Sequence, residues 1–358
     1  MNTAVEQAEM VFVIGCPRSG TYLLTTLLSE FTDISFPVET HFIPLFEPFL
    51  PLWGDLALKR NRQRLLKCIY DFLEIWTVRS EKGRPVDKIR EFSLLSTIPE
   101  KNTIAKRANS YSEIVNLLFQ IYSQKHGKKQ WGDKSVYFNE IPTEKLYKVV
   151  PNCKIIHIVR DGRDVCLSWM DTWFGPRSFS EAAKNWVDHV RNKRMWGEVH
   201  PDKYLEIKYE ELLENTKQTL ENVCQFLHLT LASNAENYEP KSELASILSS
   251  GGHHKLLSSP IDPNNKNKWK SSLSTSQLEL FEYIGGKTLQ SCEYEIQHFH
   301  FSGIKKLELQ ILMQASWFKG YFFAYRWRLI LKKILPLVLF MSDLLKIPLV
   351  KILNHKSS

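Results

Sequence analysis

Residues 15–21, with the sequence GCPRSGT, place two glycines, a serine, a threonine and an arginine in one short loop. The apolar run Val11–Ile14 precedes this loop, and apolar residues at helical spacing follow it from Thr21 to Glu30. We therefore expect a buried strand, a tight turn and a helix. The backbone N–H groups and the dipole at the start of such a helix attract an anion, and the arginine and hydroxyl groups add donors. The loop thus predicts a site for a phosphate-like group.

Gly15 and Gly20 have the G-x-x-x-x-G spacing of the nucleotide-binding P-loop. In that motif a lysine follows the second glycine and contacts the β- and γ-phosphates, and the next residue supplies a hydroxyl to Mg²⁺. Here Thr21 and Tyr22 occupy those two positions. We therefore expect the loop to bind a phosphate-like group without metal-dependent hydrolysis of a nucleoside triphosphate. A glycine turn that binds no ligand remains the alternative.

The letters PRSGT in this loop resemble the 5′-phosphosulfate loop of sulfotransferases, which use 3′-phosphoadenylyl sulfate (PAPS) as the donor. The loop is most similar to those of tyrosylprotein, heparan-type and bacterial sulfotransferases; cytosolic sulfotransferases usually carry lysine at the position of Arg18. The resemblance implies a P-loop NTPase-like α/β fold, PAPS as co-substrate and no metal. It also implies that Arg18 takes part in catalysis and that the donor is bound by Arg18, Ser19, Gly20, Thr21 and Tyr22.

A second segment, residues 158–169, has the sequence IVRDGRDVCLSW. Arg160 stands at the end of the apolar run Lys154–Val159, and open α/β sheets bind ligands at the carboxyl ends of their strands. Ser168 follows eight residues later. This pair resembles the site that holds the donor's 3′-phosphate in the same family, with Arg163 as a further contact. The alternative is an ion pair between Arg160 and one of the two aspartates that follow it.

Three further residues match the donor site by resemblance. Tyr209 follows a predicted strand at Tyr204–Lys208, as a tyrosine near the donor nucleotide does in the family. Lys268 and Trp269 lie in a polar loop, residues 249–272, that resembles the family's loop closing over the donor. The alternatives are an aromatic core residue for Tyr209 and a solvated lysine for Lys268.

Glu39 is the first candidate for the general base that sulfuryl transfer to a hydroxyl requires. It lies in FPVETHF, 21 residues after Arg18, and resembles the glutamate of tyrosylprotein sulfotransferases at that separation. Its apolar neighbours lead us to expect a raised pKa for the carboxyl group. His41 is the second candidate because imidazole titrates near neutral pH. A purely structural carboxylate remains open.

Lys134, in WGDKSVYF, is the second catalytic candidate. The segment resembles the E-K-S-x-x-Y-F stretch of heparan-type sulfotransferases, where the lysine faces the transferring group; Asp133 replaces their glutamate. A lysine there offsets charge on the leaving oxygen. The alternative is a structural ion pair, for which Asp133 is a poor partner because adjacent side chains in a strand point to opposite faces.

The order of elements predicts how these residues come together. We expect strands at Val11–Ile14, Lys154–Val159 and Tyr204–Lys208, alternating with helices at 21–30, 55–79, 111–126, 161–171, 179–199, 210–227 and 274–285. This alternation indicates a parallel sheet flanked by helices. We expect a sulfotransferase domain over residues 8–300 and a basic, apolar-rich helical extension over 303–358, which proline at 336 and 348 divides into pieces.

The charge is concentrated in that extension. Residues 303–358 hold ten lysines and arginines against two acids, a net charge of +8, which leaves 37 basic and 37 acidic residues in the rest of the chain. The neutral body speaks against a nucleic-acid partner. The extension is compatible with packing on the body, with peripheral contact to an anionic membrane, or with an oligomer interface.

Other features bear on location and metal binding. The six cysteines are scattered without a C-x-x-C pair, which suits a reducing compartment and shows no metal spacing. The first residues lack a basic region before their apolar run, and uncharged apolar stretches reach about ten residues where a membrane span needs ~20. We therefore predict a cytoplasmic protein, with peripheral membrane contact as an addition.

The sequence as a whole predicts a sulfotransferase that moves a sulfuryl group from PAPS to an acceptor hydroxyl on protein tyrosine, carbohydrate or lipid. Two alternatives remain open at this stage. One is a nucleotide kinase or NTPase on the same fold, against which the missing P-loop lysine speaks. The other is a catalytically inactive protein that binds a membrane surface through its basic extension.

Overall fold

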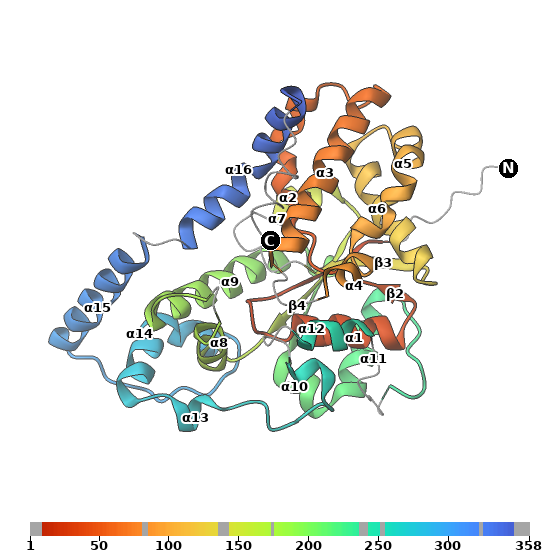
Figure 1. The fold of residues 1–358 in the computed structure, drawn as a ribbon. Helices are drawn as coiled ribbons and strands as arrows, with labels where there is room; N and C mark the ends of the chain where they lie inside the picture. Colours follow the sequence, from red (N-terminus) through yellow and green to blue (C-terminus); the bar gives the residue numbers. More distant parts are fainter. Residues whose placement is uncertain are drawn as a thin grey trace.

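A computed structural model of the chain describes residues 9–80, 85–134, 143–172, 175–235, 243–250, 255–321 and 325–346. Figure 1 shows one parallel sheet in the order β2-β3-β1-β4-β5, with helices on both faces. The strands are β1 (Val11–Ile14), β2 (Ile34–Ser35), β3 (Gln130–Lys134), β4 (Lys154–Val159) and β5 (Tyr204–Lys208). The predicted α/β class is confirmed, and so are the bounds of β1, β4 and β5. Sequence reasoning missed β2 and β3 because neither is an apolar run.

The two faces of the sheet explain why β1 is apolar throughout. Val11 and Val13 pack with α1 (Thr21–Phe31) and α11 (Thr216–Leu227). Phe12 and Ile14 pack with α3 (Lys59–Ser80) and α6 (Tyr111–Lys125) on the other face. Successive side chains of a strand point to opposite faces, so a sheet covered on both sides needs apolar residues at every position.

A third cluster of buried residues lies beyond β4. Trp186 and Phe281 form its centre, between α8 (Gly162–Met170), α9 (Phe179–Val199) and α14 (Thr275–Ser291). Gly162 is required here because a Cβ atom would lie 2.4 Å from the Trp186 ring. The remaining helices are α2 (Phe42–Phe46), α4 (Val86–Glu91), α5 (Lys101–Arg107), α7 (Thr143–Val149), α10 (Tyr209–Glu214), α12 (Glu243–Ser250) and α13 (Trp269–Ser272), with 3₁₀ turns η1 (Glu47–Trp53), η2 (Leu94–Glu100), η4 (Pro201–Lys203) and η5 (Lys255–Ser258).

The C-terminal extension is helical, as predicted. It contains α15 (Gly303–Tyr321) and α16 (Tyr325–Leu344), which follow one another along one side of the molecule (Figure 1). The expected break at Pro336 is wrong, because this proline lies inside α16. The second expected break, at Pro348, lies outside the described residues. None of the helices in the described ranges has the length and apolar character needed to cross a membrane.

The parallel sheet brings the predicted site residues to one edge. The strands end immediately before Gly15, at Lys134, before Arg160 and before Tyr209. The register pairs Val13 with Lys134 and Val159 with Lys208, so these strand ends are level with one another. Carboxyl ends of neighbouring parallel strands form the ligand-binding edge of open α/β sheets.

Candidate active site

The loop after β1 forms a tight turn that opens α1. The N–H of Ser19 donates to the carbonyl of Cys16 at 3.1 Å, and α1 begins at Thr21 with Gly20 as its N-cap. Gly20 and Arg18 have positive φ angles of 90° and 74°. Ser19 is fully buried, and in the described part of the chain its Oγ has no hydrogen-bond partner. An orphaned hydroxyl beside a helix N-terminus fits a ligand that brings oxygen acceptors.

Arg18 and Ser168 are in contact, although the sequence predicts a pairing of Ser168 with Arg160. Arg18 Nε donates to Ser168 Oγ at 3.0 Å, and this hydrogen bond links the loop to α8. Burial, followed by the nearby charge of Arg160, lowers the pKa of the Arg18 guanidinium. Two neighbouring cations in a desolvated place destabilise each other unless an anion lies between them. The arrangement therefore favours a doubly contacted anionic ligand.

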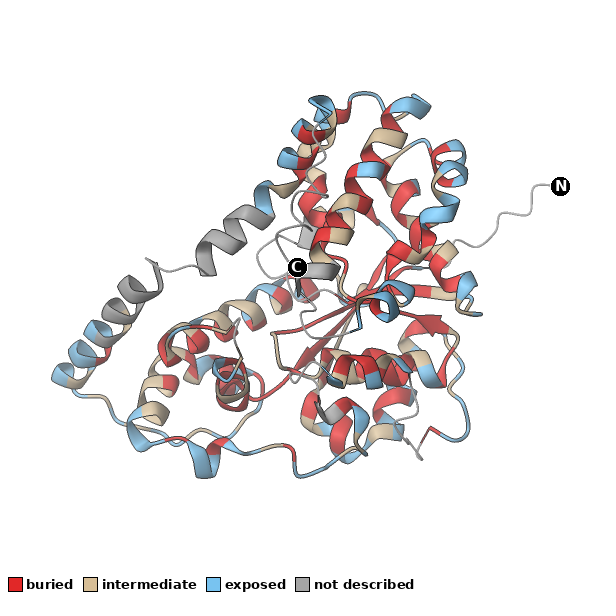
Figure 2. Cartoon of the chain, in the orientation of Figure 1, coloured by how far each residue is buried: buried red, intermediate tan, exposed pale blue. Residues whose placement is uncertain are grey.

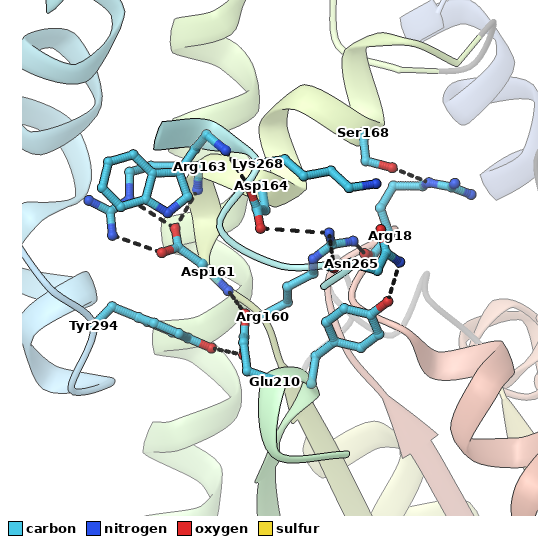
Figure 3. A network of polar contacts seen from close by, with 12 residues as sticks. Arg18, Arg160, Asp161, Arg163, Asp164, Ser168, Glu210, Asn265, Lys268 and Tyr294 are labelled. Atoms are coloured by element: carbon cyan, nitrogen blue, oxygen red, sulfur yellow. Dashed lines mark hydrogen bonds and ion pairs between the residues drawn. The ribbon is translucent and has the colours of Figure 1, made fainter. Parts of the chain in front are cut away.

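Arg160 lies at the centre of this cluster (Figure 3). Its guanidinium donates to the carbonyls of Arg18 at 3.1 Å and Asn265 at 3.3 Å, and its carbon Cζ lies 4.5 Å from the centre of the Tyr209 ring. Asp164 Oδ2 is 3.7 Å from the guanidinium, a loose ion pair. The Nε atom of Arg160 has no hydrogen-bond partner among the described residues. The alternative of a tight pair with the following aspartates is thus realised only in part.

Arg163, suggested as a further phosphate contact, is held by protein groups instead. Its guanidinium donates to both carboxylate oxygens of Asp161, at 3.0 and 2.7 Å, and to the carbonyl of Glu295. Its other face lies 3.5 Å from the Trp269 ring, and the side chain is fully buried. Protein groups thus hold Nε and Nη2 of Arg163, whereas Nη1 has no hydrogen-bond partner among the described residues.

The Tyr209 ring packs against the loop that follows β1. The ring packs so tightly against Gly20 that a Cβ atom there would lie 2.3 Å from Tyr209 Cδ2. Burial raises the pKa of the Tyr209 phenol, which stays protonated and accepts a hydrogen bond from Asn265 Nδ2 at 2.7 Å. The ring is buried with Ile158 and Leu212 in one cluster, as expected for an aromatic core residue, and it also stacks on Arg160. Its place near a donor nucleotide stays a prediction.

The closeness of Gly20 to Tyr209 leads to a stability prediction. Gly20→Ala is expected to lower the free energy of unfolding by about 2–4 kcal/mol, from the left-handed backbone and the overpacked ring together. Chemical denaturation measures it. Gly286→Ala is the matched control, because its Cβ would meet only Glu282 Cβ at 3.8 Å. Gly20→Ala with the stability of the control would refute the packing described here.

The loop between η5 and α13 is tied onto this cluster. Asn265 is buried and holds both Arg160 and Tyr209, and the N–H of Trp269 donates to Asp164 Oδ1 at 2.8 Å. Sequence reasoning missed Asn265 and Asp164 as parts of the site, because one asparagine in a polar loop carries no signal of its own. Lys268 is exposed, and its side chain extends toward Arg18 and Ser168 in Figure 3.

The structure corrects the expectation for Trp269. The indole ring is 2% exposed and belongs to the cluster between α8, α9 and α14. A ring in that position anchors the loop and is not available to cover a ligand. Of the two residues predicted at the donor, Lys268 alone has an exposed side chain, and its role there stays a prediction.

Glu39, His41 and Lys134 form a second cluster beside the first. Lys134 Nζ donates to Glu39 Oε1, and His41 Nε2 donates to Glu39 Oε2 at 2.7 Å. Burial opposes ionisation of Glu39, but the Lys134 ammonium and the His41 hydrogen bond outweigh it and hold the pKa of Glu39 well below its usual range. The expected raised pKa is wrong, because the partner lysine comes from β3, distant in sequence. Glu39 is therefore an ionised carboxylate at neutral pH.

The two clusters adjoin through Lys134. Its ammonium lies 3.5 Å from the centre of the Tyr22 ring, on the first turn of α1. Burial lowers the pKa of Lys134, and the charge of Arg18 adds to the effect, whereas Glu39 opposes it. The cations that serve an anion and the carboxylate that serves as a base thus lie next to each other. Ser135 to Phe138, which complete the WGDKSVYF resemblance, lie outside the described residues.

A buried hydrogen bond fixes the two catalytic candidates from the adjacent positions. Thr40 Oγ1 donates to Asp133 Oδ2 at 2.8 Å, and both residues are fully buried. Thr40 follows Glu39, and Asp133 precedes Lys134, so two parallel links join the segment before α2 to β3. His41 contributes to this geometry with a positive φ of 55°, and its ring meets Trp76 of α3 edge-on at 4.9 Å.

This link leads to a second stability prediction. Thr40→Val keeps the volume and removes a donor to a buried carboxylate, so it is expected to lower the free energy of unfolding by about 1–3 kcal/mol. Thr40→Ser keeps the hydroxyl and serves as the control, again by chemical denaturation. A loss in Thr40→Ser as large as that in Thr40→Val would contradict a leading contribution of the hydrogen bond.

No group of three or more His, Cys, Asp or Glu side chains suitable for a metal ion occurs in the ranges that the structure describes. The groups that could bind a ligand here are the side chains of Arg18, Arg160 and Lys134 and the backbone N–H groups at the start of α1.

The chain is similar in sequence to known proteins. Residues 10–233 match the family described as "Sulfotransferase family". A putative protein-tyrosine sulfotransferase of Caenorhabditis briggsae is 19% identical over 295 residues, which cover 80% of this chain and 85% of that protein. Sulfotransferase 2A1 of Macaca fascicularis is 27% identical over 162 residues, and the match covers 37% of this chain and 54% of that protein.

A solved structure has the same fold. The sulfotransferase domain of the olefin synthase of Synechococcus PCC 7002 superposes with a TM-score of 0.52 at 21% identity, over 80% of this chain and 95% of that one. The family match covers more than half of the chain and includes the anion-binding loop, Glu39, Lys134, Arg160 and Tyr209. The chain therefore belongs to the sulfotransferase family.

Proposed function

We propose that this sulfotransferase uses PAPS and transfers its sulfuryl group to an acceptor hydroxyl that Glu39 deprotonates. The observation that carries the proposal is the meeting, at one sheet edge, of the half-buried Arg18, the buried Arg160 and an orphaned serine with the Glu39–Lys134 pair. The loop Arg18–Thr21 and the N–H groups of α1 would hold the 5′-phosphosulfate, with Tyr22 beside it. Arg160 and Ser168 would hold the 3′-phosphate, where guanidinium offers two parallel hydrogen bonds.

PAPS supplies an activated sulfuryl group whose transfer releases adenosine 3′,5′-bisphosphate. Glu39 takes the proton as the acceptor oxygen forms its bond to sulfur, and Arg18 and Lys134 meet the charge that gathers on the leaving phosphate. In the structure Lys134 pairs with Glu39. A second anion nearby would also attract the Lys134 ammonium and so weaken the Lys134–Glu39 ion pair. The pKa of Glu39 would then rise, which would make the carboxylate a stronger base. His41 would orient the carboxylate through its 2.7 Å hydrogen bond.

The direct test is transfer of radiolabelled sulfate from PAPS, with the full chain, to peptide, glycan and lipid fractions of a cell extract. Labelled product from PAPS, and none from adenosine 5′-phosphosulfate, which lacks the 3′-phosphate, would support the proposal. Equal use of both donors would contradict the role given to Arg160 and Ser168. Absence of transfer to every fraction would contradict the proposed donor and acceptor chemistry.

The acceptor belongs to one of three hydroxyl classes in this proposal: protein tyrosine, carbohydrate or lipid. The Caenorhabditis briggsae relative is named for protein tyrosine, and the sequence around Glu39 resembles that group. The fractionated assay decides among the three. The predicted cytoplasmic location, the lack of a nucleic-acid partner, the boundary near residue 300 and membrane contact through residues 303–358 stay predictions.

The kinase alternative loses its support. Thr21 and Tyr22, which replace the P-loop lysine and hydroxyl, are the first two residues of α1. Membership of the sulfotransferase family also speaks against both the kinase and the inactive membrane-binding protein.

A further inference from the structure

Helix α16 has apolar side chains on two faces, and one of them packs on the body. Leu339 is 1% exposed, and Phe340 meets the Trp53 ring edge-on at 5.4 Å. Asp343 accepts from Arg64 Nε of α3 at 2.9 Å. This inner face fixes the helix against α3 and η1, so its opposite face is held in a defined orientation.

The outer face of α16 is apolar as well, although nothing in the described chain covers it. Its members recur at spacings of three and four residues, which places them along one side of a helix. Their exposed fractions run from 36% to 58%. Isolated exposed leucines are ordinary, whereas a continuous apolar row marks a binding surface. This α16 stripe consists of Ile334, Leu337, Val338, Met341, Leu344 and Leu345.

Helix α15 repeats the pattern. Ile304, Leu307 and Ile311 are 84%, 58% and 57% exposed, again at spacings of three and four, whereas Leu309 between them is 2% exposed. We call these three residues the α15 stripe. Figure 2 shows exposed residues along the described parts of both helices, on the same side arm of the molecule. Two consecutive helices therefore present apolar rows to the surroundings.

The charge of the segment that carries the two stripes indicates what kind of partner binds them. Residues 303–358 carry a net charge of +8, while the rest of the chain is balanced. A second copy docking through the same face would bring two such extensions together and repel. An anionic lipid surface instead attracts the lysines and accepts the apolar side chains at the boundary of head groups and acyl chains.

We propose that the α15 and α16 stripes dock on the surface of an anionic bilayer, with the flanking lysines on lipid head groups and the helices lying in the interface. The bilayer is not crossed, in keeping with the length and polarity of the described helices. The proposal is independent of PAPS and of the acceptor, since none of the stripe residues belongs to the active site.

The test is co-sedimentation of the full chain with vesicles of phosphatidylcholine, alone or mixed with phosphatidylserine. We expect binding to the mixed vesicles, with weaker binding at high salt because the charges are screened. Leu337→Ser with Met341→Ser is expected to weaken binding at least about tenfold, from the apolar area lost. Met195→Ser with Val199→Ser, at residues 61% and 72% exposed on α9, is the matched control and is expected to bind unchanged.

A second variant isolates the charges. Lys306→Gln with Lys346→Gln, both exposed lysines, is expected to weaken binding to mixed vesicles by about tenfold and to leave the fold intact. Calorimetric binding of adenosine 3′,5′-bisphosphate by all variants checks that the active site is unaffected. The proposal is overturned if the chain does not sediment with mixed vesicles, or if stripe and control variants bind equally. It is also overturned if the stripe variant converts a dimer to a monomer without changing vesicle binding.

Discussion

Glu39→Gln is expected to lower kcat by about 10²–10⁴-fold, the usual contribution of a general base. The amide keeps the size of the side chain and can still accept from Lys134, but it cannot take the acceptor's proton. Binding of adenosine 3′,5′-bisphosphate is expected to stay within a few fold, because Glu39 faces Lys134 and His41 and not Arg160. Steady-state kinetics with labelled PAPS and calorimetry of the product nucleotide measure the two effects.

The matched control for this variant is Glu243→Gln. Glu243 also pairs with a lysine, Lys88, but on the surface at 2.6 Å. Exposed pairs contribute little, so activity is expected to remain unchanged. If Glu39→Gln kept full kcat, the base would have to be another group, and the role proposed for Glu39 would fall.

The pH dependence tests the same assignment from another side. The pKa of Glu39 is depressed, so the carboxylate stays ionised as pH falls toward and below the ordinary glutamate range. The profile of kcat/KM, which reports the pKa values of the free enzyme, is therefore expected to show no acid limb from this group between about pH 5 and 8. A clear loss of kcat/KM on acidification through neutrality would indicate a base that titrates like imidazole and would favour His41.

Arg160→Ala is expected to raise the Kd for adenosine 3′,5′-bisphosphate by about 10²–10⁴-fold. Two charge-assisted hydrogen bonds to a phosphate contribute about 1.5–3 kcal/mol each, and both are lost. Arg160→Lys is expected to restore only part of the affinity, because an ammonium group cannot form the parallel pair. Ser168→Ala removes one neutral donor and is expected to cost about tenfold or less.

Arg160 also holds the loop through Asn265, so the variants need a check on folding. Thermal denaturation of the ligand-free proteins supplies it. Arg90→Ala is the control for loss of an arginine, since Arg90 pairs with Glu74 at an exposed position and is expected to leave the Kd unchanged. Equal affinity in Arg160→Ala and the control would remove Arg160 from the donor site.

The loop and the core strands could be predicted from the sequence for clear physical reasons. β1 is apolar at every position, and β4 at every position except Lys154 and His157, because helices cover both faces of the sheet. A glycine loop, followed by apolar residues at helical spacing, defines the first turn of α1. β3 could not be predicted, because its sequence QWGDK has one large apolar residue and a glycine. That glycine has a reason visible only in three dimensions, since a Cβ atom at Gly132 would lie 2.2 Å from the Phe36 ring.

The misjudged side chains share one cause, which is a partner distant in sequence. The environment of Glu39 looked apolar from its neighbours, yet Lys134, 95 residues away, dominates it. Arg163 looked available because its partners Trp269 and Glu295 come from the far end of the chain. Local sequence determines helices, turns and strand ends well, whereas the charge state of a buried group depends on whatever the fold places beside it.

The central claim is that the loop of Arg18 and Ser19, together with Arg160, binds a 3′-phosphorylated adenylate through arginine and backbone donors. Isothermal titration of the full chain with adenosine 3′,5′-bisphosphate, in the presence of a metal chelator, tests it most directly. The account predicts one saturable site per chain, no gain on adding Mg²⁺, and a marked loss with adenosine 5′-phosphate, which lacks the 3′-phosphate. Absence of binding under these conditions, or binding of ATP that requires Mg²⁺, would contradict it.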